Sequence, residues 1–217
     1  MGNQASVPKV RSRLSLEDRR EHLVRTAVKV FAQDGIGGAS ILKITQTAGV
    51  SNGTFYHYFS NKEELEEAVG ALIVQDLATK IRDDQSGLGP AERIASGAVG
   101  VLRRVAADPE LGSIMAEYFE QQSLVLRQTA DSLDADVVEG MGTGIFVDSD
   151  PSRFFVGMII AMFGSACREV LAGKAADEMG ERVAAAQLRM LGLGTAEAAQ
   201  MASWAVLRVG QPGLVDG

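Results

Sequence analysis

The chain has 217 residues, 46% of them hydrophobic and 23% charged, which is the composition of a folded globular protein. A single cysteine, Cys167, excludes an internal disulfide and a cysteine-based zinc cluster, and the two histidines lie too far apart to suggest metal ligands. The longest apolar run, residues 154–167, is too short to cross a bilayer, and the N-terminus has no apolar signal-peptide core. We therefore expect a cytoplasmic protein with no metal, no cofactor and no membrane association.

The net charge of −7 is distributed unevenly along the chain. Residues 1–62 hold nine Lys/Arg and four Asp/Glu, a balance of +5, whereas residues 63–217 hold twelve and twenty-four, a balance of −12. Such asymmetry indicates that the N-terminal part contacts a polyanion and that the acidic remainder has another task.

The N-terminal part contains signals for a basic arm and three helices. Residues 1–14 are polar and aperiodic and predict a flexible arm, which either touches DNA or is merely solvated. Ser15 is placed to cap a helix that ends at Gly35, and a Gly-Gly turn follows. Ser40 and Gly49 bound a short second helix, and a third helix runs from Asn52 to about residue 59. Two short helices joined by a tight turn predict a helix-turn-helix.

A capping-box pattern, Ser60 with Glu63, predicts a long fourth helix that continues to about residue 84. Beyond a break at residues 84–90 only helical periodicity is present, and 140–144 reads as a flexible connection. The predicted helices there are 91–106, 109–135, 151–172, 177–192 and 195–209. We predict an all-α fold with a basic arm at 1–14, a three-helix DNA-binding domain at 15–62 and a larger helical domain at 85–217.

The third predicted helix has two chemically different sides. Phe55 and Phe59 are four residues apart, so they share one face and should pack inward. The opposite side is polar and almost free of aliphatic groups, which suits the major groove, where Asn pairs with adenine and Thr touches a thymine methyl. Gly53 costs about 1 kcal/mol of helix propensity, and we expect close approach of the backbone to DNA in return.

The segment Gly49-Val50-Ser51-Asn52-Gly53-Thr54-Phe55-Tyr56-His57-Tyr58-Phe59, followed by Ser60-Asn61-Lys62, resembles the DNA-binding signature of TetR-type transcriptional regulators. The close resemblance covers roughly residues 15–70 and implies that the third helix enters the major groove. Asn52 and Thr45 stand where lysine and alanine are usual in the family. Together with the caps, the residues expected at or beside double-stranded operator DNA are Ser40, Lys43, Ser51, Asn52, Gly53, Thr54, Tyr56, His57, Tyr58 and Lys62.

The predicted helix from residue 153 is apolar nearly all the way round, so more than one side of it must be covered. One interpretation pairs this helix and the next with their copies in a homodimer, and the other is a core within one chain. The dimer interpretation selects Phe155, Ile159, Phe163, Val170, Ala184, Leu188 and Leu191.

Residues 109–135 carry a stripe of aromatic, Met and amide side chains, which is how a small molecule is often held. The resemblance implies an effector pocket here, although ordinary core packing is the alternative for each residue. The candidate pocket residues are Met115, Tyr118, Phe119, Gln122, Leu126, Met158, Met162 and Phe163.

The function predicted from these features is a bacterial, ligand-responsive transcriptional repressor that binds a palindromic operator as a homodimer and is released by a small-molecule effector. An activator of the same fold is a close alternative. An all-α enzyme or ligand carrier with a vestigial reading head is the alternative from another class, but no catalytic constellation supports an enzyme.

Overall fold

The structure, a computed structural model, describes residues 16–83, 85–121, 131–147 and 154–209, and throughout these ranges the regular secondary structure is α-helical. The fold is therefore all-α, as predicted. Its helices are α1 (Leu16–Asp34), α2 (Ile41–Ala48), α3 (Asn52–Tyr58), α4 (Lys62–Asp83), α5 (Pro90–Ala107), α6 (Pro109–Gln121), α8 (Asp131–Gly142), α9 (Phe154–Leu171), α10 (Ala176–Met190) and α11 (Thr195–Arg208).

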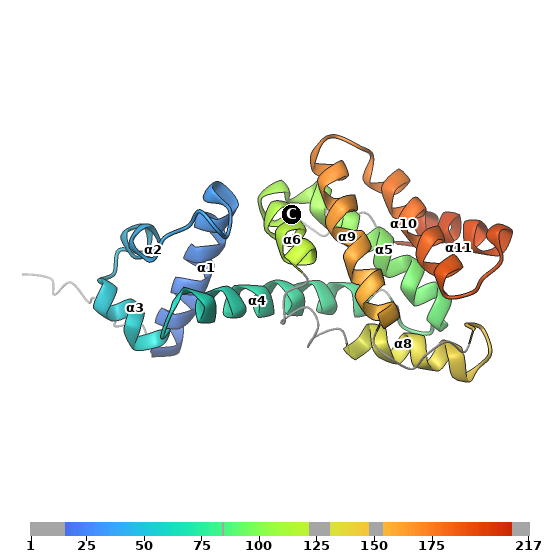
Figure 1. The fold of residues 1–217 in the computed structure, drawn as a ribbon, viewed down its shortest axis with the longest axis horizontal. Helices are drawn as coiled ribbons and strands as arrows, with labels where there is room; N and C mark the ends of the chain where they lie inside the picture. Colours follow the sequence, from blue (N-terminus) through green and yellow to red (C-terminus); the bar gives the residue numbers. More distant parts are fainter. Residues whose placement is uncertain (1–15, 84, 122–130, 148–153, 210–217) are drawn as a thin grey trace, which may run out of the picture.

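The helices form a small head and a larger body (Figure 1). Helices α1 to α3 make the head at one end, and α4 runs from the head along the body, which α5 to α11 make up. Within the body, α5 packs against α10 and α6 packs against α9, and α1 of the head contacts α6. None of the helices in the described ranges is long and apolar enough to cross a membrane.

The head is held together by a small aromatic core. Phe55 and Phe59 are buried with Ile44 of α2 and Phe31 of α1, which confirms their predicted inward direction. The Phe55 and Phe59 rings lie 5.7 Å apart, and the guanidinium of Arg20 sits 4.9 Å above the Phe59 ring. These contacts attach α3 to the head by one face and leave its other face free of the core.

The body depends on close approach between helices. A Cβ on Gly180 of α10 would lie 3.0 Å from the Cα of Val99 on α5, and one on Gly164 of α9 would lie 2.7 Å from Glu120 of α6. Larger residues at either position would push these helix pairs apart, because interiors are packed at close to crystal density.

Two predicted elements of the body differ from the structure. The continuous helix expected over 109–135 is wrong, because α6 ends at Gln121 and α8 begins separately at Asp131. Figure 1 shows α6 and α8 running in different directions, which one straight helix could not do. The flexible connection expected at 140–144 is also wrong at its start, since α8 continues through Gly142. Gly140 is buried there, where a Cβ would collide with the Phe146 ring.

The start of α4 is shifted by one residue from the predicted capping box. The Asn61 side chain, not Ser60, accepts the Glu64 backbone N–H at 2.8 Å. The carboxylate of Glu64, not Glu63, returns to accept the Ser60 backbone N–H at 2.7 Å, and this bond lowers the pKa of Glu64. The two bonds resemble those of a capping box, except that the returning bond goes to Ser60, the residue before the N-cap Asn61.

Most residues selected for a dimer interface are covered within one chain. The buried ones are Ile159, Phe163, Val170, Ala184, Leu188 and Leu191, whereas Phe155 is half-buried. The buried side chains have almost no surface left to offer a partner, so the alternative of a core within one chain describes them. The physical reason is the packing of α5 and α6 onto the sides of α9 and α10 that these residues occupy.

Candidate nucleic-acid interface and ligand cavity

Backbone caps set the positions of α2 and α3. The Ser40 hydroxyl accepts the Lys43 backbone N–H at 3.2 Å, and Gly49 ends α2 with φ of 68°, a conformation that favours glycine. The Ser51 hydroxyl accepts the Thr54 backbone N–H at 3.1 Å and so begins α3. Because only three residues separate the helices, these caps fix the direction in which α3 leaves the head.

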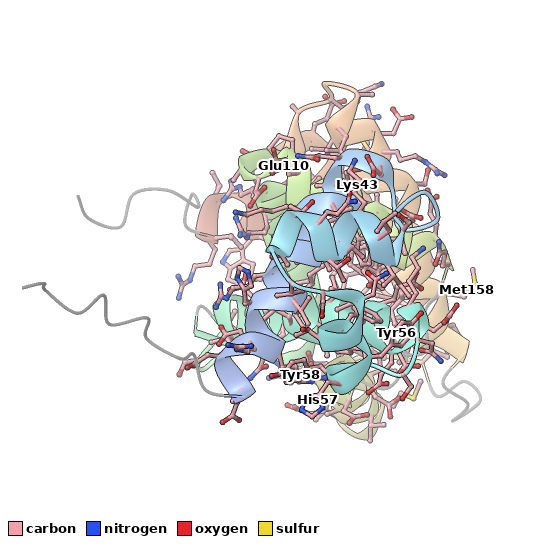
Figure 2. The ribbon with its side chains drawn as sticks, turned by 90° about the vertical axis from the view of Figure 1, so that its left-hand side faces the viewer. Lys43, Tyr56, His57, Tyr58, Glu110 and Met158 are labelled. Carbon is pink, nitrogen blue, oxygen red and sulfur yellow. The ribbon has the colours of Figure 1, made fainter. Side chains whose placement is uncertain are left out.

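The outer side of α3 is open to solvent at the end of the head. Tyr56 is 58% exposed, His57 is exposed, and the half-buried Tyr58 ring meets His57 edge-on at 5.0 Å. Figure 2 looks onto this end of the molecule, with Tyr56, His57 and Tyr58 on α3 and Lys43 on α2. Asn52 and Gly53 at the start of α3 are exposed as well, and Thr54 is half-buried. The face therefore offers hydroxyl, imidazole and amide groups suited to base edges and phosphates.

The protein's own packing does not require glycine at position 53. A Cβ there would meet only the Ser51 hydroxyl oxygen, at 3.7 Å, which is ordinary contact. Gly53 is also absent from the residues with positive φ. The space beside this residue is thus open toward the exterior, where an approaching backbone of another molecule would use it.

The Asn52 side chain is not free to turn toward a DNA base, because it is hydrogen-bonded to α2. The Thr45 hydroxyl lies 2.8 Å from Asn52 Oδ1 and 3.0 Å from the Leu42 carbonyl oxygen, and Thr45 itself is buried. In the orientation found, the hydroxyl proton satisfies Oδ1 and the Asn52 amino group faces away as a donor. This contact ties the two departures from the family pattern, Thr45 and Asn52, to each other.

The two lysines expected at phosphates already have partners in the head. Lys43 Nζ lies 2.6 Å from the Asp34 carboxylate and remains partly exposed. Lys62 Nζ donates to the Ile36 carbonyl oxygen at 2.5 Å and lies 3.2 Å from Glu66, with only 21% of its side chain exposed. Lys62 therefore has a structural task that the sequence motif did not disclose, and its phosphate contact stays a prediction.

The body contains a partly open cavity of about 160 Å³ between α4, α5, α6, α8, α9 and α10. Of the eight predicted pocket residues, Phe119 and Phe163 line it, with ring centroids 5.2 Å apart. Met115 and Tyr118 line a separate, smaller hollow beside α4, which Phe119 also borders. The Tyr118 hydroxyl donates to the Glu66 carbonyl oxygen, and burial raises the pKa of this phenol.

The remaining pocket predictions divide into two groups. Gln122 and Leu126 lie outside the described residues. Met158 and Met162 lie on α9 but are not among the described lining residues, and Met158 projects outward with 41% of its surface exposed (Figure 2). Met158 and Met162 are four residues apart and share one side of an apolar helix. Their spacing could not reveal whether that side faces the cavity, because the packing of the neighbouring helices decides it.

Sequence reasoning missed the polar residues of the cavity. Gln187 of α10, Arg93 of α5 and Asp136 of α8 all line it, as does Ile159, which was assigned to a dimer interface. Arg93 binds Asp136 at 2.6 Å, and burial raises the pKa of this carboxyl although Arg93 lowers it. Arg93, Asp136 and Gln187 are at least 43 positions apart in the chain and lie on three helices, so no spacing in the sequence could have brought them together.

The fold and the exposed α3 face define a helix-turn-helix protein with a helical body that contains a cavity. Residues 23–69 match the family model described as bacterial regulatory proteins, tetR family. The chain therefore carries a DNA-binding domain of the TetR family.

Curated relatives are transcription regulators rather than enzymes. The nicotine-responsive repressor HdnoR of Paenarthrobacter nicotinovorans is 30% identical over 49% of this chain and 54% of its own length. The repressor AcnR of Corynebacterium diphtheriae is 32% identical over 50% of this chain and 51% of its own length. The matched part of the chain thus spans about half the length of these relatives.

The likeness to solved structures extends over most of the chain. RolR in complex with resorcinol superposes with a TM-score of 0.70 at 27% identity, covering 87% of this chain and 94% of RolR. The regulator FadR of Bacillus halodurans has a TM-score of 0.64 at 22% identity, covering 78% of this chain and 94% of FadR, which supports the fold.

Replacing Gly53 with alanine separates stability from DNA binding. We expect Gly53→Ala to raise the free energy of unfolding by about 0.5–1 kcal/mol, because alanine favours a helix and the space is open. The same change should weaken DNA binding about tenfold or more, because it places a methyl group where the backbone of α3 comes nearest to the DNA. Denaturant unfolding and fluorescence anisotropy would measure the two effects. Gly142→Ala, at an open position of α8, is the matched control and should leave DNA binding unchanged. Undiminished affinity in Gly53→Ala would contradict this role.

Removing the Thr45 hydroxyl should alter which base Asn52 prefers. Thr45→Val keeps the side-chain shape but releases Asn52 Oδ1, so the amide can turn and both donate and accept. We expect base preference to change at one operator position per half-site and to stay the same elsewhere. Binding to a set of single-base operator variants measures this. Thr47→Val, which removes an α2 hydroxyl bonded to the Lys43 carbonyl, is the control. An identical preference profile in Thr45→Val would refute the orienting role.

Proposed function

We propose that this chain is a transcriptional repressor that binds a palindromic operator as a homodimer and is released by a small-molecule effector. The main observation behind this proposal is the outer face of α3. This face is polar and exposed, while Phe55 and Phe59 on the opposite face pack into the head. A face of this kind on the second helix of a helix-turn-helix matches the geometry that enters a major groove. HdnoR and AcnR are both described as repressors, which supports repression rather than activation. DNA binding would place the protein in the cytoplasm, and we assign it no catalytic role.

A homodimer would give two reading helices the spacing of a twofold operator. Support comes from the outward side of α9, where Met158 is exposed and Ala161 and Met162 are half-buried. These residues follow the i, i+3, i+4 spacing of one helix face and make an apolar stripe. We propose this stripe, rather than the buried residues expected from the sequence, as part of the dimer contact.

Effector release requires a physical link between cavity and head, and α6 supplies one. Its residues Glu117, Tyr118 and Phe119 are consecutive, so their side chains point about 100° apart. Glu117 accepts the Ile36 backbone N–H at 2.9 Å, at the end of α1. Tyr118 donates to the backbone of α4, while Phe119 lines the cavity. A ligand that displaces Phe119 would therefore shift the contacts that orient the head.

The link works as a switch only if the ligand binds one orientation of the head better than the other. The Lys62 ammonium donates to the carbonyl oxygen of Ile36, and the backbone N–H of the same Ile36 donates to the Glu117 carboxylate. The turn after α1 is thus clamped between α4 and α6, and a change in either helix is transmitted to it. We propose that effector binding moves α4 and α6 relative to each other and so separates the two reading heads.

The salt dependence of DNA binding tests the proposed function directly. Duplexes selected from random sequence should bind with a log affinity that falls linearly with log salt concentration, because phosphate contacts release counterions. Electrophoretic or anisotropy titrations between low and physiological salt would measure the slope. A slope near zero, or no selected sequence, would refute a DNA-binding role.

Removing the Glu117 carboxylate should loosen the head without altering what it reads. We expect Glu117→Met to lower affinity about fivefold for all operator variants alike, since about 1 kcal/mol of hydrogen bonding that orients the head is lost. Glu117→Gln keeps an acceptor for the Ile36 N–H and should bind within about twofold of the unchanged protein. Equal binding by both variants would exclude Glu117 as the link.

A further inference from the structure

An exposed leucine lies on the helix-turn-helix. Among the residues of the head whose side chains the structure describes, the exposed large hydrophobic ones are Leu42, with 56% of its surface exposed, and Tyr56. They lie on α2 and α3, whereas the other described residues of this class lie on α8 or later in the chain. Tyr56 has a hydroxyl that can hydrogen-bond, but the Leu42 side chain has only carbon to offer. Single exposed leucines are common on protein surfaces, so the meaning of this one depends on where it lies.

Leu42 points away from the core of the head and lies on the side of α2 that meets α3. Ile44, two positions later, is fully buried, and successive helical residues are rotated by about 100°, so Leu42 projects from nearly the opposite side of α2. Thr45 follows Leu42 by three residues and is its neighbour on the helix surface. The Thr45 hydroxyl lies 3.0 Å from the Leu42 carbonyl oxygen and 2.8 Å from Asn52 Oδ1. One hydroxyl thus contacts both residues and places the first turn of α2 beside the first turn of α3.

This position borders the surface that would meet DNA. In a helix-turn-helix the N-terminal residues of the second helix contact base edges, and the first helix crosses the phosphate backbone beside them. Asn52 and Gly53 open α3 and are exposed. Figure 2 looks onto this end of the head, with Lys43, the residue after Leu42, labelled on α2. Leu42 therefore lies at the side of the groove that the start of α3 would enter.

The chemistry of Leu42 calls for an apolar partner on the DNA. A leucine side chain neither donates nor accepts a hydrogen bond, so hydrophobic contact is the main favourable interaction open to it. The apolar group that a base presents in the major groove is the C5-methyl of thymine. Deoxyribose carbons are the other apolar groups of DNA, but they lie beside hydrated phosphates, and covering those with leucine costs desolvation. The thymine methyl is therefore the better partner.

We propose that Leu42 is a specificity-determining residue whose side chain packs on the C5-methyl group of one thymine in each half-site of the operator. This role rests on the proposed function, and it names a base of the operator together with the residue that selects it. Thr54 of α3, whose own methyl group could contact a thymine, is the competing reader, and deoxyribose is the competing partner of Leu42.

Replacing thymine with deoxyuridine tests this contact, because the change removes the methyl group and keeps every hydrogen-bonding group of the base. The full chain is titrated with selected duplexes in which each thymine is replaced in turn, in both half-sites. We expect one replacement to weaken binding by the unchanged protein about fourfold per half-site, as for one buried methylene. Leu42→Ala should lose the response at that thymine alone. Leu42→Met, which keeps an apolar side chain of similar volume, should retain it.

The matched control is Leu207→Ala, which truncates a leucine that is 87% exposed on α11 and should leave every deoxyuridine response unchanged. A response that persists in Leu42→Ala but disappears in Thr54→Ser assigns the methyl group to Thr54 and overturns the proposal. Equal weakening of Leu42→Ala on all operator variants indicates a contact with deoxyribose and overturns it too. So does an operator in which no thymine methyl affects binding.

The outcomes also separate the role of Leu42 from the function on which it rests. A chain that selects no duplex refutes DNA binding altogether. A chain that binds its selected duplex with the expected salt dependence, yet shows no thymine response that depends on Leu42, refutes only the role of Leu42.

Discussion

The peptide group of Ile36 is the point on which the relation of head to body depends. Its N–H is held by Glu117 of α6 and its carbonyl by Lys62 of α4, so the turn after α1 is fixed from both sides. The α4 helix alone would join the two parts by a single rod, which leaves rotation about the rod free. The second attachment through α6 removes that freedom, and Tyr118 reinforces it at the backbone of α4.

The same helix explains how a cavity inside the body can influence a surface some distance away. The α6 helix packs closely on α9 through Gly164, and Phe119 faces the cavity from the turn that also carries Glu117. Small movements in a closely packed interior are transmitted rather than absorbed. A ligand that displaces Phe119 would therefore act on the turn that Glu117 holds.

The reading head combines two opposite requirements on one short helix. Its inner face must be held firmly, and Phe55 and Phe59 achieve this with the aromatic core of the head. Its outer face must remain unoccupied, and the open space beside Gly53 shows that the chain leaves it so. Between the two, Thr45 restrains Asn52 from below, so a buried residue on α2 takes part in presenting an exposed one on α3.

The local elements of the head followed from the sequence because their causes are local. Ser40, Gly49 and Ser51 cap their helices through residues within five positions, and the spacing of Phe55 and Phe59 fixes a common face whatever the surroundings. The TetR-type segment carries the same information as a motif. Even here a one-residue error arose at α4, because Ser60 and Asn61 are both acceptable caps and the chain direction chose between them.

The body was predictable only as a set of helices. An apolar helix such as α9 shows that it must be covered but not by what, so Ile159 and Leu188 could be assigned to a partner when α5 and α6 already cover them. Gln187, Arg93 and Asp136 come from three helices, and their meeting at one cavity depends on how those helices cross. The sequence by itself determined the caps of α2 and α3, the two faces of α3 and the resemblance to the TetR family. The tertiary structure decided the cavity and the clamp on Ile36, because each consists of contacts between residues distant in the chain.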